Sequence, residues 1–280
     1  MLEILVIIHV VYYLAWTLSA QIYAWDEGCR DPMMMTILDD VLESIDGDAG
    51  VRSILVGAHW TVVCSRFGGL ASTVLSEKPH GHEVVREVGQ LHSKSARQLA
   101  AFARSENPLE AGIGWAAINS LLEVDTASAV EVDAGELLIQ HGKDKNVALV
   151  GHFPFIPQLR KAANNLWVLE KQPSEREYPS SAAPDLIPQA DVVALTGSAL
   201  INHTLDQLMS LCSAGAMVLV LGPTTPLSTV LFDHGATLIS GSRVVNEAAV
   251  LRTVAQGATF RQVEGIQKLT LSNPNLAGQK

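Results

Sequence analysis

The segment VVALTGSALINHT, residues 192–204, joins a short strand pattern to a polar turn and decides the fold class. Its first four residues are all apolar, which is typical of a strand that is buried on both faces of a parallel sheet. Similar short runs, each followed by a turn and then a helix pattern, occur at residues 147–150, 166–169, 217–221 and 237–239. This alternation predicts an α/β fold with a Rossmann-like, doubly wound parallel sheet.

The preceding part of the chain has a different pattern. Residues 51–65 hold two β-branched runs on either side of residues 57–59, which predicts two antiparallel strands, and the pair Gly-Gly at 68–69 predicts the next turn. Residues 95–104 and 109–122 have the composition and end signals of helices. This half therefore predicts a smaller α+β module.

The first residues allow three interpretations. Residues 4–25 carry no charged side chain and are long enough to cross a bilayer as a helix. The segment could be a membrane anchor, a helix buried in the fold, or an upstream extension if translation begins at Met33, Met34 or Met35. An amphipathic helix pattern starts after Thr36 and favours the third interpretation. We thus expect a hydrophobic extension at residues 1–32, an α+β domain at 33–128 and a Rossmann-like domain at 129–280.

Composition excludes several classes of protein. Hydrophobic residues make up 48% of the chain and charged residues only 17%, whereas disordered chains and coiled coils carry a higher fraction of charge. The formal net charge of −10 argues against nucleic acid as a partner. Cys29, Cys64 and Cys212 form no CxxC pair, so we expect reduced thiols in a cytoplasmic protein.

The ends of the predicted strands carry the candidate ligand-binding residues. In open parallel sheets, ligands bind beyond the carboxyl ends of the strands. The glycines and polar side chains expected there are Gly151, Glu170, Thr196, Gly197, Asn202, Thr204, Gly222 and Thr225. The pattern at residues 196–204 predicts a helix with Asn202 and Thr204 on it. Hydroxyls and backbone N–H groups would lie at the start of this helix, and that end of a helix favours an anionic group.

Glu170 invites a test for nucleotide binding. It follows Gly151 by nineteen positions, close to the spacing at which an acidic residue holds a ribose hydroxyl. The turn is Gly-His-Phe-Pro, however, and lacks the further glycines that allow a pyrophosphate to approach. A dinucleotide is therefore disfavoured, while an adenosyl group or another compact ligand stays open.

His152 and Glu170 are also the candidate metal ligands, with His59 as a third. Neutral imidazole and carboxylate groups suit a divalent transition metal. The same two residues, His152 and Glu170, are the candidate acid–base groups if the protein is an enzyme. No HExxH, P-loop or GxSxG motif occurs, so the sequence leaves open whether there is turnover.

Several motifs, taken in order, resemble a known family. GHFPFI (151–156), TGSALINHT (196–204) and GPTTPL (222–227) are similar to the putative heavy-metal chelation family. GAHWTVVCSRFGGLAST (57–73) and GWAAINSLL (114–122) are similar to the companion domain of that family, which resembles the enolase N-terminal domain. The resemblance implies a Rossmann-like domain packed on an enolase-N-terminal-like domain, with a site in the cleft between them.

The resemblance links this site to chelation of heavy metal or iron, or to processing of a small chelating ligand. The leading hypothesis is a cytoplasmic protein that binds a metal ion or a metal-chelating small molecule through residues of both domains. The residues expected to contribute are His152, Glu170, Thr196, Asn202, Thr204 and Thr225, with Asn119 and His59 from the first domain. We also expect a homo-oligomer.

Two other hypotheses remain. One is a transferase or oxidoreductase that uses an adenosyl or pterin-type cofactor bound by the Rossmann-like half. The other is a non-catalytic partner of a metal transport system, for which a membrane anchor at residues 4–25 would be suggestive.

Overall fold

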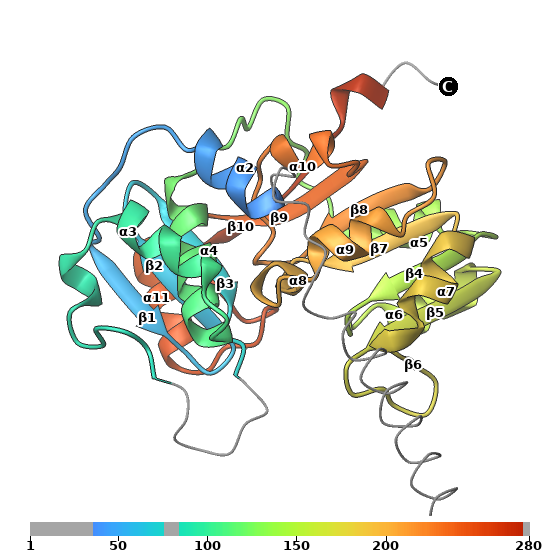
Figure 1. Cartoon of the computed structure of the whole chain (residues 1–280), viewed down its shortest axis with the longest axis horizontal. Helices are drawn as coiled ribbons and strands as arrows, with labels where there is room; N and C mark the ends of the chain where they lie inside the picture. Colours follow the sequence, from blue (N-terminus) through green and yellow to red (C-terminus); the bar gives the residue numbers. More distant parts are fainter. Residues whose placement is uncertain (1–35, 76–83, 277–280) are drawn as a thin grey trace, which may run out of the picture. The chain divides into compact units, whose positions relative to one another are not determined.

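The computed structural model describes residues 36–75 and 84–276 (Figure 1). The elements discussed below belong to one compact unit that spans residues 37–280. The hydrophobic extension expected at residues 1–32 lies outside the described residues, as do the interpretations attached to it. Within the described part of the chain, no helix combines the length and the apolar character needed to cross a membrane.

Seven strands form the larger sheet, and six of them run parallel (Figure 1). Their spatial order is β10 (Ile266–Ser272), β9 (Leu238–Val244), β8 (Met217–Leu221), β7 (Val192–Thr196), β4 (Asn146–Val150), β5 (Asn165–Glu170) and β6 (Tyr178–Pro179). The chain adds β5 and β6 on one side of β4 and then returns to form β7 on the other side. The strand order therefore reverses between β4 and β7, as in the Rossmann fold, which confirms the predicted fold class.

Helices cover both faces of this sheet, which is why its central strands β4, β7 and β8 are almost entirely apolar. Val147 and Leu149 of β4 pack in one buried cluster with Leu138 and Leu159, whereas Ala148 faces the opposite side. The first face is covered by α5 (Ala134–His141) and α6 (Ile156–Ala162). The second face is covered by α7 (Ala183–Leu186), α8 (Ser198–Ile201), α9 (Leu205–Ser210) and α10 (Val230–Asp233).

Short turns of 3-10 helix complete the chain around these elements. They are η1 (Leu91–Ser93), η2 (Ala101–Arg104), η3 (Ser180–Ala182), η4 (Ile187–Gln189) and η5 (Pro274–Leu276). The connection at residues 171–188, which contains four prolines, holds β6, η3 and α7. Pro184 lies at the start of α7, where the missing N–H of proline leaves no hydrogen bond of the helix unmade.

The smaller sheet is an antiparallel meander of three strands, as the pattern at residues 51–65 predicts. Its strands are β1 (Ser53–Val56), β2 (Trp60–Cys64) and β3 (Gly68–Ser72). The helix α4 (Pro108–Leu121) packs on this sheet and α3 (Ala96–Ala100) packs on α4, whereas α2 (Ile37–Ser44) contacts α10. Ser95 begins α3 with a capping box that involves Gln98, so the helix starts where the sequence predicts.

The turn expected at the Gly-Gly pair is wrong, because both glycines lie inside β3. A Cβ atom on Gly69 would lie 2.1 Å from the carbonyl oxygen of Ala116 in α4. On the opposite face, a Cβ atom on Gly68 would lie 2.6 Å from a methyl group of Val244 in β9. These glycines therefore serve close packing on the two faces of the strand, which a local turn signal cannot distinguish from a turn.

The second face of the small sheet is covered by a helix from the far end of the chain. α11 (Glu247–Ala255) lies against β1 and β2, and Val250 and Val254 share a buried cluster with Val62 and Leu70 (Figure 1). The small sheet thus lies between α4 from its own half and α11 from the C-terminal half. Residues from both halves are consequently brought together next to the strand ends of the large sheet.

Candidate functional site

A cavity of about 510 Å³ lies at the carboxyl ends of β4, β7 and β8, beside the reversal in strand order. Ligand sites in proteins typically have volumes of about 300–1,000 Å³, so this cavity can hold a compact organic molecule. Trp60 and Ser72 of the small sheet contribute to its wall, together with residues from the large sheet and from the segment that follows α11. The cavity therefore combines residues from both halves of the compact unit.

Hydroxyl groups form the floor of the cavity, which we define as Ser72, Thr196, Ser198 and Thr224. Ser72 Oγ lies 3.1 Å from Ser198 Oγ and accepts a hydrogen bond from Thr224 Oγ1, also at 3.1 Å. The Ser72 N–H donates to Thr224 Oγ1 at 2.9 Å, and the Ser198 N–H donates to Thr196 Oγ1 at 3.3 Å. These contacts fix β3 against the turns after β7 and β8, and all four residues line the cavity.

Aromatic rings contribute to the side walls. Phe153 and Phe155 are stacked, with ring centroids 5.2 Å apart and an interplanar angle of 17°. Trp60 and Phe260 are tilted, with centroids 5.5 Å apart, and Trp60 Nε1 donates to the Ala258 carbonyl at 2.9 Å. Because these rings line the cavity, its walls suit a ligand with a flat apolar part.

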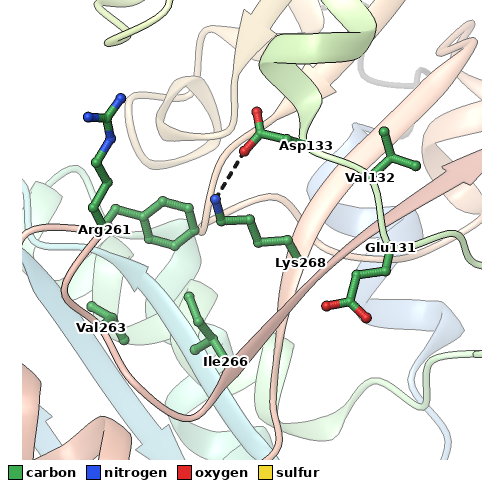
Figure 2. Close-up of a pocket in the computed structure, with 8 residues that line it drawn as sticks. Glu131, Val132, Asp133, Arg261, Val263, Ile266 and Lys268 are labelled. Carbon is green, nitrogen blue, oxygen red and sulfur yellow. Dashed lines mark hydrogen bonds and ion pairs between the residues drawn. The ribbon is translucent and has the colours of Figure 1, made fainter.

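A charged rim separates this cavity from a smaller one of about 390 Å³ (Figure 2). We define the rim as Asp133, Phe260, Arg261 and Lys268, which line both cavities. Lys268 Nζ donates to Asp133 Oδ2 at 3.0 Å and lies 5.5 Å from the centroid of the Phe260 ring. Figure 2 shows the guanidinium of Arg261 pointing away from the Asp133–Lys268 pair.

The position of Asp133 is fixed by the start of α5. Its Oδ1 accepts the Gly135 N–H at 2.9 Å, so the carboxylate caps the helix. Burial alone would raise the pKa of Asp133, but hydrogen bonds from Lys268 and Gly135 lower it below its ordinary value. Asp133 is therefore a stable anion at the boundary between the two cavities.

Three of the residues predicted from the sequence line the larger cavity, namely His152, Thr196 and Gly222. His152 is largely exposed, and its Nδ1 lies 2.8 Å from Glu177 Oε1. A hydrogen bond from the Ser174 backbone and the contact with His152 lower the pKa of Glu177. One nitrogen of the His152 imidazole is thus in contact with a carboxylate at the outer edge of the cavity.

The other predicted residues do not line the cavity. Glu170 ends β5, and the exposed His59 lies in the turn between β1 and β2. Asn119 donates to the carbonyls of Leu70 at 3.0 Å and Thr224 at 3.1 Å, so it connects α4 to β3 and the floor. Asn119 therefore helps to hold the floor in position but does not itself line the cavity.

The expectation that Asn202 and Thr204 lie on a helix with Thr196 at its start is wrong. α8 has only four residues, and Asn202 ends it. His203 has a left-handed φ of 55°, which stops the helix, and its Nε2 lies 2.9 Å from the Ser105 carbonyl. Thr204 occupies the N-cap position of α9, and its hydroxyl donates to the Ala199 carbonyl. Both residues belong to a turn between two short helices.

The glycine turns do not offer the backbone donors that the sequence suggests. The Gly151 N–H donates to the Leu169 carbonyl at 3.0 Å, and the Gly197 N–H donates to the Leu221 carbonyl at 2.8 Å. The Gly222 N–H donates to the Ser240 carbonyl at 3.0 Å, and the Thr225 N–H to the Gly222 carbonyl at the same distance. Each group extends a strand ladder or a turn, so an anionic ligand must find other donors.

Thr225 is buried and its hydroxyl has no hydrogen-bond partner in the described part of the chain. A Cβ atom on Gly197 would lie 2.5 Å from this hydroxyl oxygen. Thr225 therefore packs directly on the turn after β7, which explains why only glycine fits at position 197.

The cavity lining holds donor groups that suit an organic ligand with an acidic part. Within residues 36–75 and 84–276, no group of three or more His, Cys, Asp or Glu side chains could hold a metal. The cavity presents hydroxyls, aromatic rings and the cations Arg261 and Lys268, together with the Asp133 carboxylate and the His152 imidazole. Arginine and lysine recognise carboxylate and phosphate groups, whereas transition metals prefer imidazole and thiolate ligands.

Local sequence patterns do not predict the rim or part of the floor. Asp133 and Lys268 meet although 135 positions separate them, and Ser72 meets Thr224 across 152 positions. No local pattern identifies such pairs. A signal was present at residues 259–268, which follow a helix pattern and combine an aromatic residue with two basic ones.

Comparison with known proteins identifies the same family from both halves. The sequence profiles of two families, both described as putative heavy-metal chelation, match residues 133–273 and 38–122. A curated relative, the uncharacterized protein MJ0500 of Methanocaldococcus jannaschii, is 27% identical over 186 residues, covering 64% of this chain and 70% of the relative.

Two crystal structures of DUF364-family proteins of unknown function have the same fold. The protein from Desulfitobacterium hafniense is 29% identical, with a TM-score of 0.73 over 84% of this chain and 97% of that chain. The protein from Pyrococcus horikoshii is 21% identical, with a TM-score of 0.71 over 84% and 98% of the two chains. These matches confirm the resemblance drawn from the sequence motifs. The chain belongs to the putative heavy-metal chelation family.

Proposed function

We propose that this protein binds a compact, metal-chelating small molecule in the larger cavity, so that the metal arrives in a chelate. The observation that carries the proposal is the combination of stacked rings, hydroxyls and cations around one volume. Small chelators commonly combine a flat ring with oxygen or nitrogen donors. The aromatic side chains of the cavity suit the ring, and its hydroxyls and cations suit the donor atoms. The description of the family, putative heavy-metal chelation, supports the link to a metal.

The roles of the residues follow from their chemistry. Phe153 and Phe155 would cover the face of a ring, while Ser72 and Ser198 would donate or accept hydrogen bonds at its edge. His152 lies at the outer edge, where its second nitrogen could meet a metal carried by the ligand. Glu170 and His59, which lie outside the cavity lining, have no direct part in this proposal.

The test uses two flat probes of equal shape. Pyridine-2,6-dicarboxylate is a chelating dianion, and pyridine-2,6-dicarboxamide is its neutral counterpart. Calorimetry should show one-to-one binding of at least one probe, and saturation at 100 times Kd should add about 2.7 kcal/mol to the free energy of unfolding. S-adenosylmethionine and NAD are titrated in parallel, because a response to those compounds alone would favour the cofactor hypothesis.

A cavity-filling substitution locates the binding site. Ser198→Trp should abolish binding, because the indole would occupy the cavity, whereas Ser210→Trp on the exposed end of α9 should bind normally. Should Ser198→Trp fail to fold, Phe153→Ala provides the second measurement, and loss of the ring contact should weaken binding by about tenfold. Unchanged binding in these variants, or no binding of either probe to the wild type, would contradict the proposal.

A further inference from the structure

The cationic side chains that could bind an anion in the larger cavity lie at the rim between the two cavities. The backbone N–H groups of Gly151, Gly197 and Gly222, which would serve this purpose in a nucleotide-binding turn, are engaged by carbonyl groups. The rim is the part of the cavity lining that holds cations, Arg261 and Lys268. An acidic ligand in the larger cavity would therefore meet its charge partners at this boundary.

The two cations differ in their present contacts. Lys268 is paired with Asp133 and lies near the ring of Phe260. Arg261 is exposed and, in the described part of the chain, makes no hydrogen bond or ion pair that would hold its guanidinium. One cation is thus already available, and the other is held by a carboxylate of the protein.

The contact between Asp133 and Lys268 can be exchanged at low cost. The two side chains are 47% and 44% exposed, and an ion pair so exposed to water contributes a factor of about five or less to an equilibrium. Asp133 would keep its second anchor, the Gly135 N–H, after Lys268 leaves. The ammonium group can therefore turn from Asp133 to a ligand without disturbing the start of α5.

We infer that Lys268 binds a carboxylate of the ligand at the rim, with the exposed Arg261 side chain turning in as a second cation, and that Asp133 holds Lys268 in place of the ligand when the cavity is empty. This inference rests on the proposed function and adds the class of ligand, a flat chelator that carries a carboxylate group. Asp133 then acts as an internal competitor that rejects weakly acidic or neutral molecules. The smaller cavity accepts the part of the ligand that extends beyond the rim.

The inference makes a specific prediction for Asp133→Asn. Asparagine keeps the helix cap, because its amide oxygen accepts the Gly135 N–H, but it releases Lys268 from the ion pair. Binding of pyridine-2,6-dicarboxylate should therefore strengthen by about threefold to tenfold, within the range expected for a lost exposed ion pair and a removed like charge. Binding of the dicarboxamide should stay unchanged.

Two further variants test the cations. In wild-type protein at low salt, the dicarboxylate should bind at least about tenfold more tightly than the dicarboxamide, since charge-assisted hydrogen bonds are stronger than neutral ones. Lys268→Met should remove most of this preference, and Arg261→Met a smaller part of it. The preference should also decrease as ionic strength rises, because the rim is exposed to solvent.

Glu131→Gln is the matched control for the change in charge. Glu131 lies two positions before Asp133, lines the smaller cavity and contacts Gln267, but it does not contact Lys268. Equal effects of Glu131→Gln and Asp133→Asn would overturn the role of Asp133.

The possible results separate the two proposals. Equal affinity for both probes, unaffected by Lys268→Met, would overturn the carboxylate subsite while the proposed function stands. Absence of binding by either probe would contradict both the subsite and the proposed function. A dicarboxylate preference that Lys268→Met removes and Asp133→Asn increases would support both.

Discussion

The floor and the rim of the larger cavity differ in packing and in exposure to solvent. The floor consists of hydroxyls that bond to one another and of turns packed so tightly that a glycine is needed at position 197. The rim consists of charged side chains and the Phe260 ring. The two side chains of its ion pair, Asp133 and Lys268, are 47% and 44% exposed. We therefore expect the floor to fix the position of a ligand, and the rim to select among ligands by changing its ion-pair partner.

The two regions should therefore respond differently to mutation. Substitutions in the floor should change the free energy of unfolding, because they alter buried contacts. Substitutions in the rim should change ligand preference with little effect on stability.

The largest effect is expected for Gly197→Ala. The added Cβ would lie 2.5 Å from Thr225 Oγ1 and 2.7 Å from the Thr225 backbone nitrogen, so the floor would have to shift. We expect a loss of about 3 kcal/mol in the free energy of unfolding, measured by urea denaturation. Gly215→Ala is the control, because no atom lies within 4 Å of its Cβ position. Equal stability of the two variants would show that the floor is not tightly packed.

A smaller effect of opposite sign is expected for Thr225→Val. The hydroxyl of Thr225 is buried without a partner in the described residues, so replacing it with a methyl group should stabilise the protein by about 1 kcal/mol. Thr270→Val is the comparison, because the Thr270 hydroxyl bonds to Ser240 Oγ at 2.6 Å and its loss should destabilise. If both variants lose stability in urea denaturation, the Thr225 hydroxyl has a partner when the protein is in solution.

The smallest effect on stability is expected for Lys268→Met, at less than about 0.5 kcal/mol at pH 7. The pKa of Asp133 is lowered in the folded protein, so the pair stabilises above the ordinary carboxyl pKa of 3.8 and loses this contribution as the pH falls through the folded-state pKa. The difference in urea midpoint between wild type and variant should consequently disappear at acidic pH. A loss as large as that of Gly197→Ala would mean that the rim is part of the packed structure.

The sequence predicts β4, β5, β7, β8 and the start of β9 because each of these strands has a local signal, whereas β6 and β10 lack one and are not predicted. The apolar runs at residues 147–150, 192–195 and 217–221 coincide with β4, β7 and β8 almost residue for residue. Burial on both faces requires this composition, and the turns that follow supply the boundaries. The order of the strands then places the site at the reversal between β4 and β7.

The candidate site is predicted less well because its walls come from distant segments. Strand-end residues such as Thr196 and Gly222 follow from the topology. Ser72 reaches the cavity through the contact of β3 with β9, and Lys268 through the pairing of β10 with β9. The glycines at positions 68 and 69 show the same limit. Whether these glycines form a turn or allow close packing depends on which helix and strand approach β3, and the local sequence does not contain that information.

The packing of α11 on the small sheet also bears on how the chain folds as it is synthesised. The strands β1, β2 and β3 leave the ribosome early, together with α4, which covers only one of their faces. The second face stays exposed to solvent until residues 247–255 have been made. The N-terminal module is therefore expected to be the last to reach its final stability, although it is the first to be translated.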